Sequence, residues 1–344
     1  MTKLSHENFI KARDYVLTHT DDINRAWFRY HFKDSGTNAF MNVLAKYQHE
    51  NGGFGGLNYE FNYQGPCLKS TEHAIEYIIN LKEKPSADHP VIQNMMQYLL
   101  ERYRPTLGNW DKVEAPEINN GVYAWHARYR GTRTSTAEME ECERNYNYFT
   151  DEDERIKSYN ANEHVCFAAF IAYYSEIVPN DLYQDIIKYP TAHMLRYWDE
   201  NSPDYNGAIF DKDSPYEFEY FQWFVSCLKD KDIKDQLTMI LHQNPAAFME
   251  LDYAKSDNEY VHLPCDCVGS PNNIVYPVVK DLVDDSLTYR MKQQCDDGRF
   301  PLGWSFGKSD ELKQLEKLYE AHLTLRMLVK LKQFGRIEGL CLNM

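Results

Sequence analysis

The sequence lacks any apolar run of the roughly 20 residues that a helix needs to cross a bilayer. The first residues, from Met1 to Phe9, also lack the apolar core of a secretory signal. The eight cysteines are scattered rather than spaced as a disulfide framework, and Cys166 and Cys227 lie in apolar helical context. Reduced thiols are therefore expected. Together these absences predict a cytoplasmic protein without a membrane span.

Positive charge is in short supply as well. The chain has 37 Lys and Arg against 52 Asp and Glu, which gives a net charge of −15. This balance disfavours nucleic acid and anionic membrane surfaces as partners, and solubility is its simplest interpretation. The negative net charge is still compatible with a small anionic ligand that binds at a local cluster of basic residues. No phosphate-binding loop, dinucleotide fingerprint or H-E-x-x-H motif is present, and we expect no cofactor.

Alternating strand patterns are scarce too, and helical periodicity runs through most of the chain. The pattern predicts an all-α fold in a single domain over residues 1–344. An exposed acidic excursion is expected at 130–158, and a long Pro-containing loop, in which a short hairpin is one option, at 245–273. The segment 164–174 is apolar nearly all round and must be covered on most sides. Helices are predicted at 6–18, 21–33, 36–49, 70–83, 88–103, 119–129, 138–147, 162–176, 180–197, 215–229, 232–243, 274–295 and 310–334.

A local pattern, Gln-x-x-x-Gly-x-Phe, occurs twice, each time after a predicted helix. The first copy runs from Gln48 to Phe54 and the second from Gln294 to Phe300. Glycine can end a helix in the left-handed conformation, the aromatic ring can fold back, and the Gln amide can bond free groups of the turn. Weaker echoes follow Gly108, as Gly-Asn-Trp, and Gly207, as Gly-Ala-Ile-Phe.

The spacing of these turns predicts a repeat of helical hairpins. Gly52 and Gly298 lie 246 residues apart, which five units of about 49 residues would span. About six hairpins fit the chain length. One hairpin cannot bury its apolar face alone, so neighbouring hairpins must stack.

The Gln-x-x-x-Gly-aromatic turn resembles the repeat motif of squalene–hopene cyclases and of the related terpenoid cyclases and protein prenyltransferases. The chain also resembles a family of bacterial proteins of similar length, in FRYHF at 28–32, YQHENGGFGG at 47–56, DDGRFPLGWSF at 296–306 and LKQFGRIEG at 331–339. The resemblance implies an α/α toroid, with inner and outer helix rings around a central cavity. It implies little about the reaction, because one fold hosts many functions.

The catalytic and metal motifs of those relatives are missing or weak. There is no D-x-D-D, and the acidic run at 151–154 is better explained as a solvated loop. The pair Asp21-Asp22 lacks a second carboxylate at helical spacing. His262, Cys265 and Cys267 are the densest set of soft ligands, but ordinary buried loop residues explain them better than zinc, so we expect no metal.

Two places offer candidate acids. Asn162, Glu163 and His164 open the most apolar helix, where capping is the simpler role for Asn162 and Glu163. If that helix end faces the cavity, Glu163 and His164 form an acid–base pair there, with Asn162 beside them. Glu60 is the second candidate, in a loop that the resemblance places over the cavity. By the same reasoning the cavity is lined by Trp125, His126, Tyr216, Glu219 and Trp304.

Three functions follow from these observations. The first is a terpenoid-cyclase-like or prenyltransferase-like enzyme that binds an apolar or isoprenoid-like small molecule among aromatic side chains and transforms it. The second is a non-catalytic toroid that binds a small-molecule ligand. The third is a carbohydrate-active hydrolase or lyase, which needs two carboxyl groups about 5–10 Å apart across the cavity. The aromatic content favours an enzyme of the first class, and the missing D-x-D-D counts against it.

Overall fold

The computed structural model describes residues 2–59, 63–110, 152–157, 159, 161–205 and 215–340. They divide into two compact units. The first unit comprises Met1–Val43, Ala208–Gln222 and Leu241–Met344, and the second comprises Leu44–Gly207 and Trp223–Ile240. The described residues are mostly helical, which confirms the all-α expectation.

The first unit is built from both ends of the chain. Residues 245–273, expected as a loop, contain the 3₁₀ turns Pro245–Phe248 and Tyr253–Asp257 and no strand, so the optional hairpin was wrong. A backbone hydrogen bond of 2.9 Å from the Glu250 N–H to the His262 carbonyl joins the ends of its middle part. The helices of this unit are α1 (His6–His19), α2 (Asp22–Lys33), α3 (Thr37–Leu44), the start of α12 (Pro215–Cys227), α14 (Pro264–Cys267), α15 (Tyr276–Lys292) and α16 (Asp310–Gln333).

The second unit holds the middle of the chain. The only strands among the described residues lie here, two residues each and antiparallel: β1 (Tyr103–Arg104) and β2 (Asn109–Trp110). A π-helical turn at Met194–Trp198 extends one of its helices. The helices of this unit are α4 (Leu68–Ile79), α5 (Pro90–Arg102), α9 (Glu152–Lys157), α10 (Ala161–Tyr173), α11 (Asn180–His193), the end of α12 and most of α13 (Lys231–Gln243).

Side-chain caps explain why several helices begin where the sequence predicts. Ser5 Oγ accepts the Asn8 N–H at 3.2 Å at the start of α1, and Ser309 Oγ accepts the Leu312 N–H at 3.2 Å at the start of α16. Each cap pairs one of the free N–H groups that every helix start leaves. The predicted helices at 119–129 and 138–147, and most of the acidic segment, lie outside the described residues; its last part forms α9.

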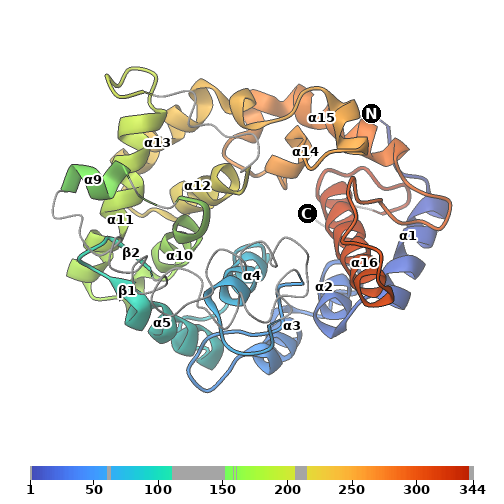
Figure 1. The fold of residues 1–344 in the computed structure, drawn as a ribbon, viewed down its shortest axis with the longest axis horizontal. Coiled ribbons are helices and arrows are strands. Elements are labelled where there is room, and N and C mark those ends of the chain that lie inside the picture. The colour runs from blue at the N-terminus through green and yellow to red at the C-terminus, as the bar shows by residue number, and fades with distance from the viewer. Residues whose placement is uncertain are drawn as a thin grey trace. The chain divides into compact units, whose positions relative to one another are not determined.

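Helix α10 is the most buried helix of the second unit. Each residue from Val165 to Ala172 is at most 1% exposed. Helices α4 and α11 both pack against it (Figure 1). The uniformly apolar sequence therefore forms a helix that is covered on most sides, as expected.

The two Gln-Gly-aromatic turns have the same hydrogen bonds. Gln48 Nε2 donates to the Gly52 carbonyl at 3.0 Å, and Gln294 Nε2 donates to the Gly298 carbonyl at 2.9 Å. The same amide also reaches a neighbouring helix, at Val91 of α5 in the first case and at Asn8 of α1 in the second, each at 3.0 Å. The predicted role of Gln in the turn is confirmed at both positions.

The glycines of both turns lie against backbone. Gly52 has a φ of +87° and Gly298 a φ of +94°, in the left-handed region that favours glycine. A Cβ at Gly52 would lie 2.0 Å from the Asn94 carbonyl oxygen of α5, and one at Gly298 would lie 2.2 Å from the Lys11 carbonyl carbon of α1. Each turn therefore docks on a helix so closely that a side chain has no room.

The weaker echo at Gly108 shares part of this arrangement. Gly108 has a φ of +65°, and a Cβ there would lie 2.2 Å from the ring of Tyr189 on α11. Its aromatic neighbour Trp110 donates Nε1–H to the Leu99 carbonyl at 2.8 Å. The echo at Gly207 lies outside the described residues.

The two ends of the chain are joined within the first unit. Helix α1 packs against α16 (Figure 1). The Leu4 N–H donates to the Arg336 carbonyl at 2.7 Å, and the Glu338 N–H donates to the Leu4 carbonyl at 2.9 Å. Helix α1 therefore packs against the Gly298 turn and accepts its Gln amide, as α5 does for the Gly52 turn.

Candidate functional site

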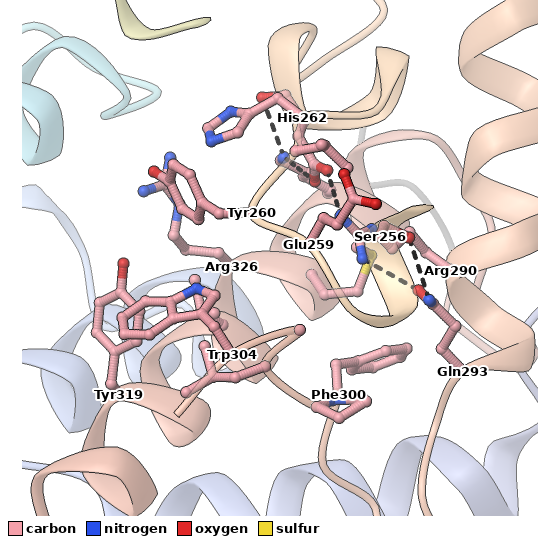
Figure 2. Close-up of a pocket in the computed structure, with 18 of the residues that line it drawn as sticks. Ser256, Glu259, Tyr260, His262, Arg290, Gln293, Phe300, Trp304, Tyr319 and Arg326 are labelled. Atoms are coloured by element: carbon pink, nitrogen blue, oxygen red, sulfur yellow. Dashed lines mark hydrogen bonds and ion pairs between the residues drawn. The ribbon is translucent and has the colours of Figure 1, made fainter. Parts of the chain in front are cut away.

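A pocket of about 140 Å³ lies within the first unit (Figure 2). It is formed by α12, the segment 256–266, α15, the loop after the Gly298 turn, and α16. The residues that line it are Tyr216, Glu219, Ser256, Glu259, Tyr260, Val261, His262, Asp266, Arg290, Gln293, Phe300, Pro301, Leu302, Gly303, Trp304, Tyr319, Leu323, Arg326, Met327 and Lys330.

One face of α16 forms a wall of this pocket. Its lining residues are Tyr319, Leu323, Arg326, Met327 and Lys330, which recur every three or four positions and therefore share a face of the helix. The register of this face is fixed next to the Gly298 turn, because the Phe300 N–H donates to Thr324 Oγ1 on α16 at 3.0 Å.

Aromatic side chains form a second, continuous surface of the pocket. The hydroxyl groups of Tyr216 and Tyr260 are hydrogen-bonded to each other, and both rings meet the His262 ring edge-on with centroids 5.2 Å apart. The Tyr260 ring lies 6.2 Å from Trp304, and Trp304 lies 5.9 Å from Tyr319. Figure 2 shows Trp304 and Tyr319 side by side, with Tyr260 between them and His262. Such a surface can pack against a flat or apolar ligand.

Charged groups of the pocket gather around Asp266. Its carboxylate accepts the Leu263 N–H at 3.1 Å, pairs with Arg290 at 2.6 Å, and meets the Lys330 ammonium group at 3.4 Å. Burial raises the pKa of Asp266, but the two cations outweigh it and hold this pKa well below the usual range. Asp266 therefore stays ionised and anchors the short helix α14 to α15 and α16.

Two further ionisable groups face the pocket. Arg326 lies 4.0 Å from Glu219, at the outer limit of an ion pair. Burial in the pocket wall is the main cause that lowers the pKa of His262 to about 4; Asp266 opposes this shift, and the nearby cations add to it. The imidazole is therefore neutral near pH 7.

The pocket brings together some of the residues that the sequence nominated. Tyr216, Glu219 and Trp304 all line it, and so does His262. Cys265 and Cys267 do not: both are buried, with the Cys265 N–H bonded to Ser286 Oγ at 2.9 Å. Within the described residues, no three His, Cys, Asp or Glu side chains are grouped as a metal ion would require.

The proposed acid–base pair lies on α10 of the second unit. His164 is 2% exposed, its Nδ1 lies 2.7 Å from Asn109 Oδ1, and it is not among the lining residues of the pocket. Helix α10 begins at Ala161, which places Asn162 and Glu163 in its first turn. Glu60, Trp125 and His126 lie outside the described residues.

Sequence reasoning missed several lining residues, namely Tyr260, Tyr319, Arg326 and Lys330. Tyr260 lies in the segment 245–273, which has no helical periodicity from which the side a residue faces could be predicted. The three residues of α16 had a usable signal: they share one face with Leu323, and that helix is the next one after the second Gln-Gly-aromatic turn.

Neither the composition of the helices nor the comparisons with other proteins reduces the number of candidate functions. Among the described residues, no helix combines the length and the apolar character that crossing a bilayer requires. No protein-family model matches the chain, and the searches of curated proteins and of solved structures gave no significant match.

Proposed function

We propose that this chain is a terpenoid-cyclase-like α/α toroid that binds a small organic molecule in the pocket between α12, α15 and α16. The observation that carries the ligand assignment is the run of aromatic rings from Tyr216 through Tyr260 to Trp304 and Tyr319. Rings in contact with one another, and open to a pocket, give a ligand a large apolar surface at little entropic cost.

The toroid itself is supported by the matched turns. Both turns use a Gln amide, a left-handed Gly and a Thr hydroxyl in the same way, as two members of one repeat would. The Gly298 turn, near the end of the chain, packs against α1 at its start. A repeat array that closes on itself needs such a contact, because its last hairpin must be completed by its first helix.

A carbohydrate ligand is a second candidate, favoured by the polar groups that share the pocket. Glu219, Glu259 and Asp266 place three carboxyl groups among the lining residues, and Gln293 adds an amide. Asp266 is held by Arg290 and Lys330, so Glu219 and Glu259 would be the acidic pair of a hydrolase.

The test is calorimetric titration of the full chain with three neutral probes: geraniol, naphthalene-2-methanol and methyl β-glucoside. We expect one of the apolar probes to bind, and Trp304→Ala to weaken that binding at least about tenfold by removing the largest ring of the surface. Leu17→Ala, which removes a 38% exposed apolar side chain elsewhere in the first unit, is the matched control.

Each outcome of this titration supports or contradicts one class of ligand. Failure of all three probes would overturn the proposal. Binding of the glucoside alone would replace the apolar ligand with a carbohydrate. Mass spectrometry of the same mixtures would reveal any conversion of the bound probe.

A further inference from the structure

The imidazole ring of His262 lines the pocket with both of its nitrogen atoms available. Within the described part of the chain, neither ring nitrogen takes part in a hydrogen bond. Neither is sealed off by protein atoms, so a molecule in the pocket can reach them. The side chain is nevertheless half-buried, and a polar group in such a place gains from a hydrogen-bond partner. The ring therefore offers a ligand a hydrogen-bonding position that the protein itself leaves unused.

The backbone around this imidazole is fixed by two hydrogen bonds. The His262 carbonyl accepts the Glu250 N–H at 2.9 Å, and the next residue, Leu263, donates its N–H to the Asp266 carboxylate at 3.1 Å. The imidazole is flanked by two tyrosine rings, and Figure 2 shows that of Tyr260 next to it. The imidazole is therefore held in place before a ligand binds, which reduces the entropy that binding costs.

The half-buried carboxylates of the pocket, by contrast, already face cations. Asp266 pairs with Arg290 at 2.6 Å and lies 3.4 Å from Lys330, and Glu219 lies 4.0 Å from Arg326. A ligand group that donated a hydrogen bond to either carboxylate would compete with these cations. A donor that used the imidazole would meet no such competition among the described residues.

The charge balance of the pocket favours a ligand without charge. Three cations and three carboxylates line the pocket, so their formal charges cancel. Because the pKa of His262 is about 4, the imidazole adds no charge near pH 7, and one of its nitrogens keeps the lone pair that accepts a hydrogen bond. A charged ligand would bring a charge that these groups do not balance. The six charged lining residues are Arg290, Arg326, Lys330, Glu219, Glu259 and Asp266.

We infer that the ligand of this pocket is an uncharged alcohol, whose hydroxyl group donates its hydrogen to the His262 imidazole while its apolar body packs against Trp304 and Tyr319. The Tyr260 ring connects the two parts, because its centroid lies 5.2 Å from that of His262 and 6.2 Å from that of Trp304. The inference rests on the proposed function and adds the polar group by which the ligand is recognised.

The experiment compares each alcohol with its methyl ether, which keeps the carbon body and the oxygen atom but cannot donate a hydrogen bond. Geraniol is paired with geranyl methyl ether, and naphthalene-2-methanol with 2-(methoxymethyl)naphthalene, by calorimetric titration of the full chain at pH 7. We expect the alcohol of the binding pair to bind about fivefold more tightly than its ether, as one net hydrogen bond would give.

Variants assign this preference to the imidazole. His262→Phe keeps a ring between the two tyrosines but removes the acceptor, so the alcohol and the ether should bind about equally. His262→Gln supplies an amide oxygen, which can accept, and should retain part of the preference. The matched control is His242→Phe, at another half-buried histidine of the first unit, whose ring bonds to the Ile274 carbonyl at 2.7 Å outside the pocket lining. This control should keep the full preference.

The outcomes separate this inference from the proposed function. Equal binding of alcohol and ether in the wild type, or an unchanged preference in His262→Phe, would overturn the hydroxyl assignment and leave the pocket as an apolar site. Binding of no alcohol or ether, with the glucoside also inactive, would remove the proposed function itself. If the glucoside alone binds, its loss in His262→Phe would support the role of the imidazole, and unchanged binding would contradict it.

A measurement on the wild-type chain decides the question if the His262 variants fail to fold, as judged by circular dichroism. Nuclear magnetic resonance of the chain labelled with nitrogen-15 follows the two ring nitrogens of His262 during the same titrations. The nitrogen that accepts should shift further with the alcohol than with the ether, because only the alcohol donates to it. Equal shifts with both probes would contradict the inference.

Discussion

The backbone N–H of Phe300 donates to the side-chain oxygen of Thr324 at 3.0 Å, and both groups are buried. The same bond joins Phe54 to Thr71 at 3.1 Å in the second unit. In each case it connects the aromatic residue of a Gln-Gly-aromatic turn to the helix that follows that turn. The repeat therefore includes a fourth member, the Thr hydroxyl, which the motif in the sequence does not reveal.

Removing this hydroxyl should destabilise the chain. Thr324→Val keeps the shape of the side chain but leaves the buried Phe300 N–H without its acceptor, which we expect to lower the free energy of unfolding by about 1–3 kcal/mol. Thr324→Ser should recover most of the loss. Thr18→Val, at an exposed Thr of α1 that bonds its own helix, is the control and should cost under about 0.5 kcal/mol. Urea unfolding measures all three, and an equal loss for Thr18 and Thr324 would contradict the prediction.

Substitution of Gly298 separates backbone strain from a steric clash. Gly36 also has a left-handed φ, +77°, but a Cβ there would meet no atom within 4 Å. Gly36→Ala should therefore cost only the conformational strain, about 1 kcal/mol. Gly298→Ala adds an overlap with the backbone of α1 and should cost about 2–4 kcal/mol. Chemical unfolding of the two variants tests this; similar losses would show that α1 moves away without penalty.

The helices were predictable from the sequence because their signals are local. The segment predicted at 6–18 is His6–His19 and that at 310–334 is Asp310–Gln333, each preceded by a Ser cap. The helix expected over 36–49 ends earlier, at Leu44, and a 3₁₀ turn follows. Gln48 leaves the helical conformation, and its amide bonds to Gly52 and to Val91, a residue 43 positions further along. That second contact is tertiary, so no local pattern could place the helix end.

The pocket was predictable only where an aromatic or acidic residue stood out. Tyr216, Glu219 and Trp304 were nominated as residue types that suit a cavity, and all three line this pocket. Arg326 and Lys330 were overlooked because a charged residue on a long helix normally indicates a solvated face. Their half-buried state depends on the packing of 256–266 and α12 over α16, which the sequence alone does not specify.

The buried His193 should make the second unit sensitive to mild acid. His193 is 5% exposed, and burial lowers its pKa below the ordinary value of 6.5. Above pH 6.5 neither the folded nor the unfolded chain holds the extra proton. As the pH falls below 6.5 the unfolded chain binds it first, so the free energy of unfolding decreases, by at most about 1.4 kcal/mol per pH unit.

Urea unfolding at pH 7.5, 6.5 and 5.5 measures this dependence. His193→Gln should reduce the loss of stability between pH 6.5 and 5.5, although it lowers stability at every pH by disturbing the core. His6→Gln, at an exposed position of α1, should leave the pH dependence as in the wild type. An unchanged pH slope in His193→Gln would show that this histidine is not the group that titrates.

Substitution of Asp266 should lower the stability of the chain strongly. Asp266→Asn leaves the half-buried Arg290 and Lys330 without their shared anion, which we expect to cost about 3–5 kcal/mol. Asp22→Asn, at an exposed partner of Arg25, is the control and should cost under about 1 kcal/mol.

The stabilisation by Asp266 should also depend on pH. Because the folded pKa of Asp266 is depressed, its contribution to the free energy of unfolding is fully present above the unfolded value of about 3.9 and is lost only as the pH falls toward the folded pKa. The stability difference between the wild type and Asp266→Asn should therefore stay constant from pH 8 to 5 and shrink below about pH 4. A difference that already declines between pH 7 and 5 would mean that Asp266 is not held ionised by these two cations.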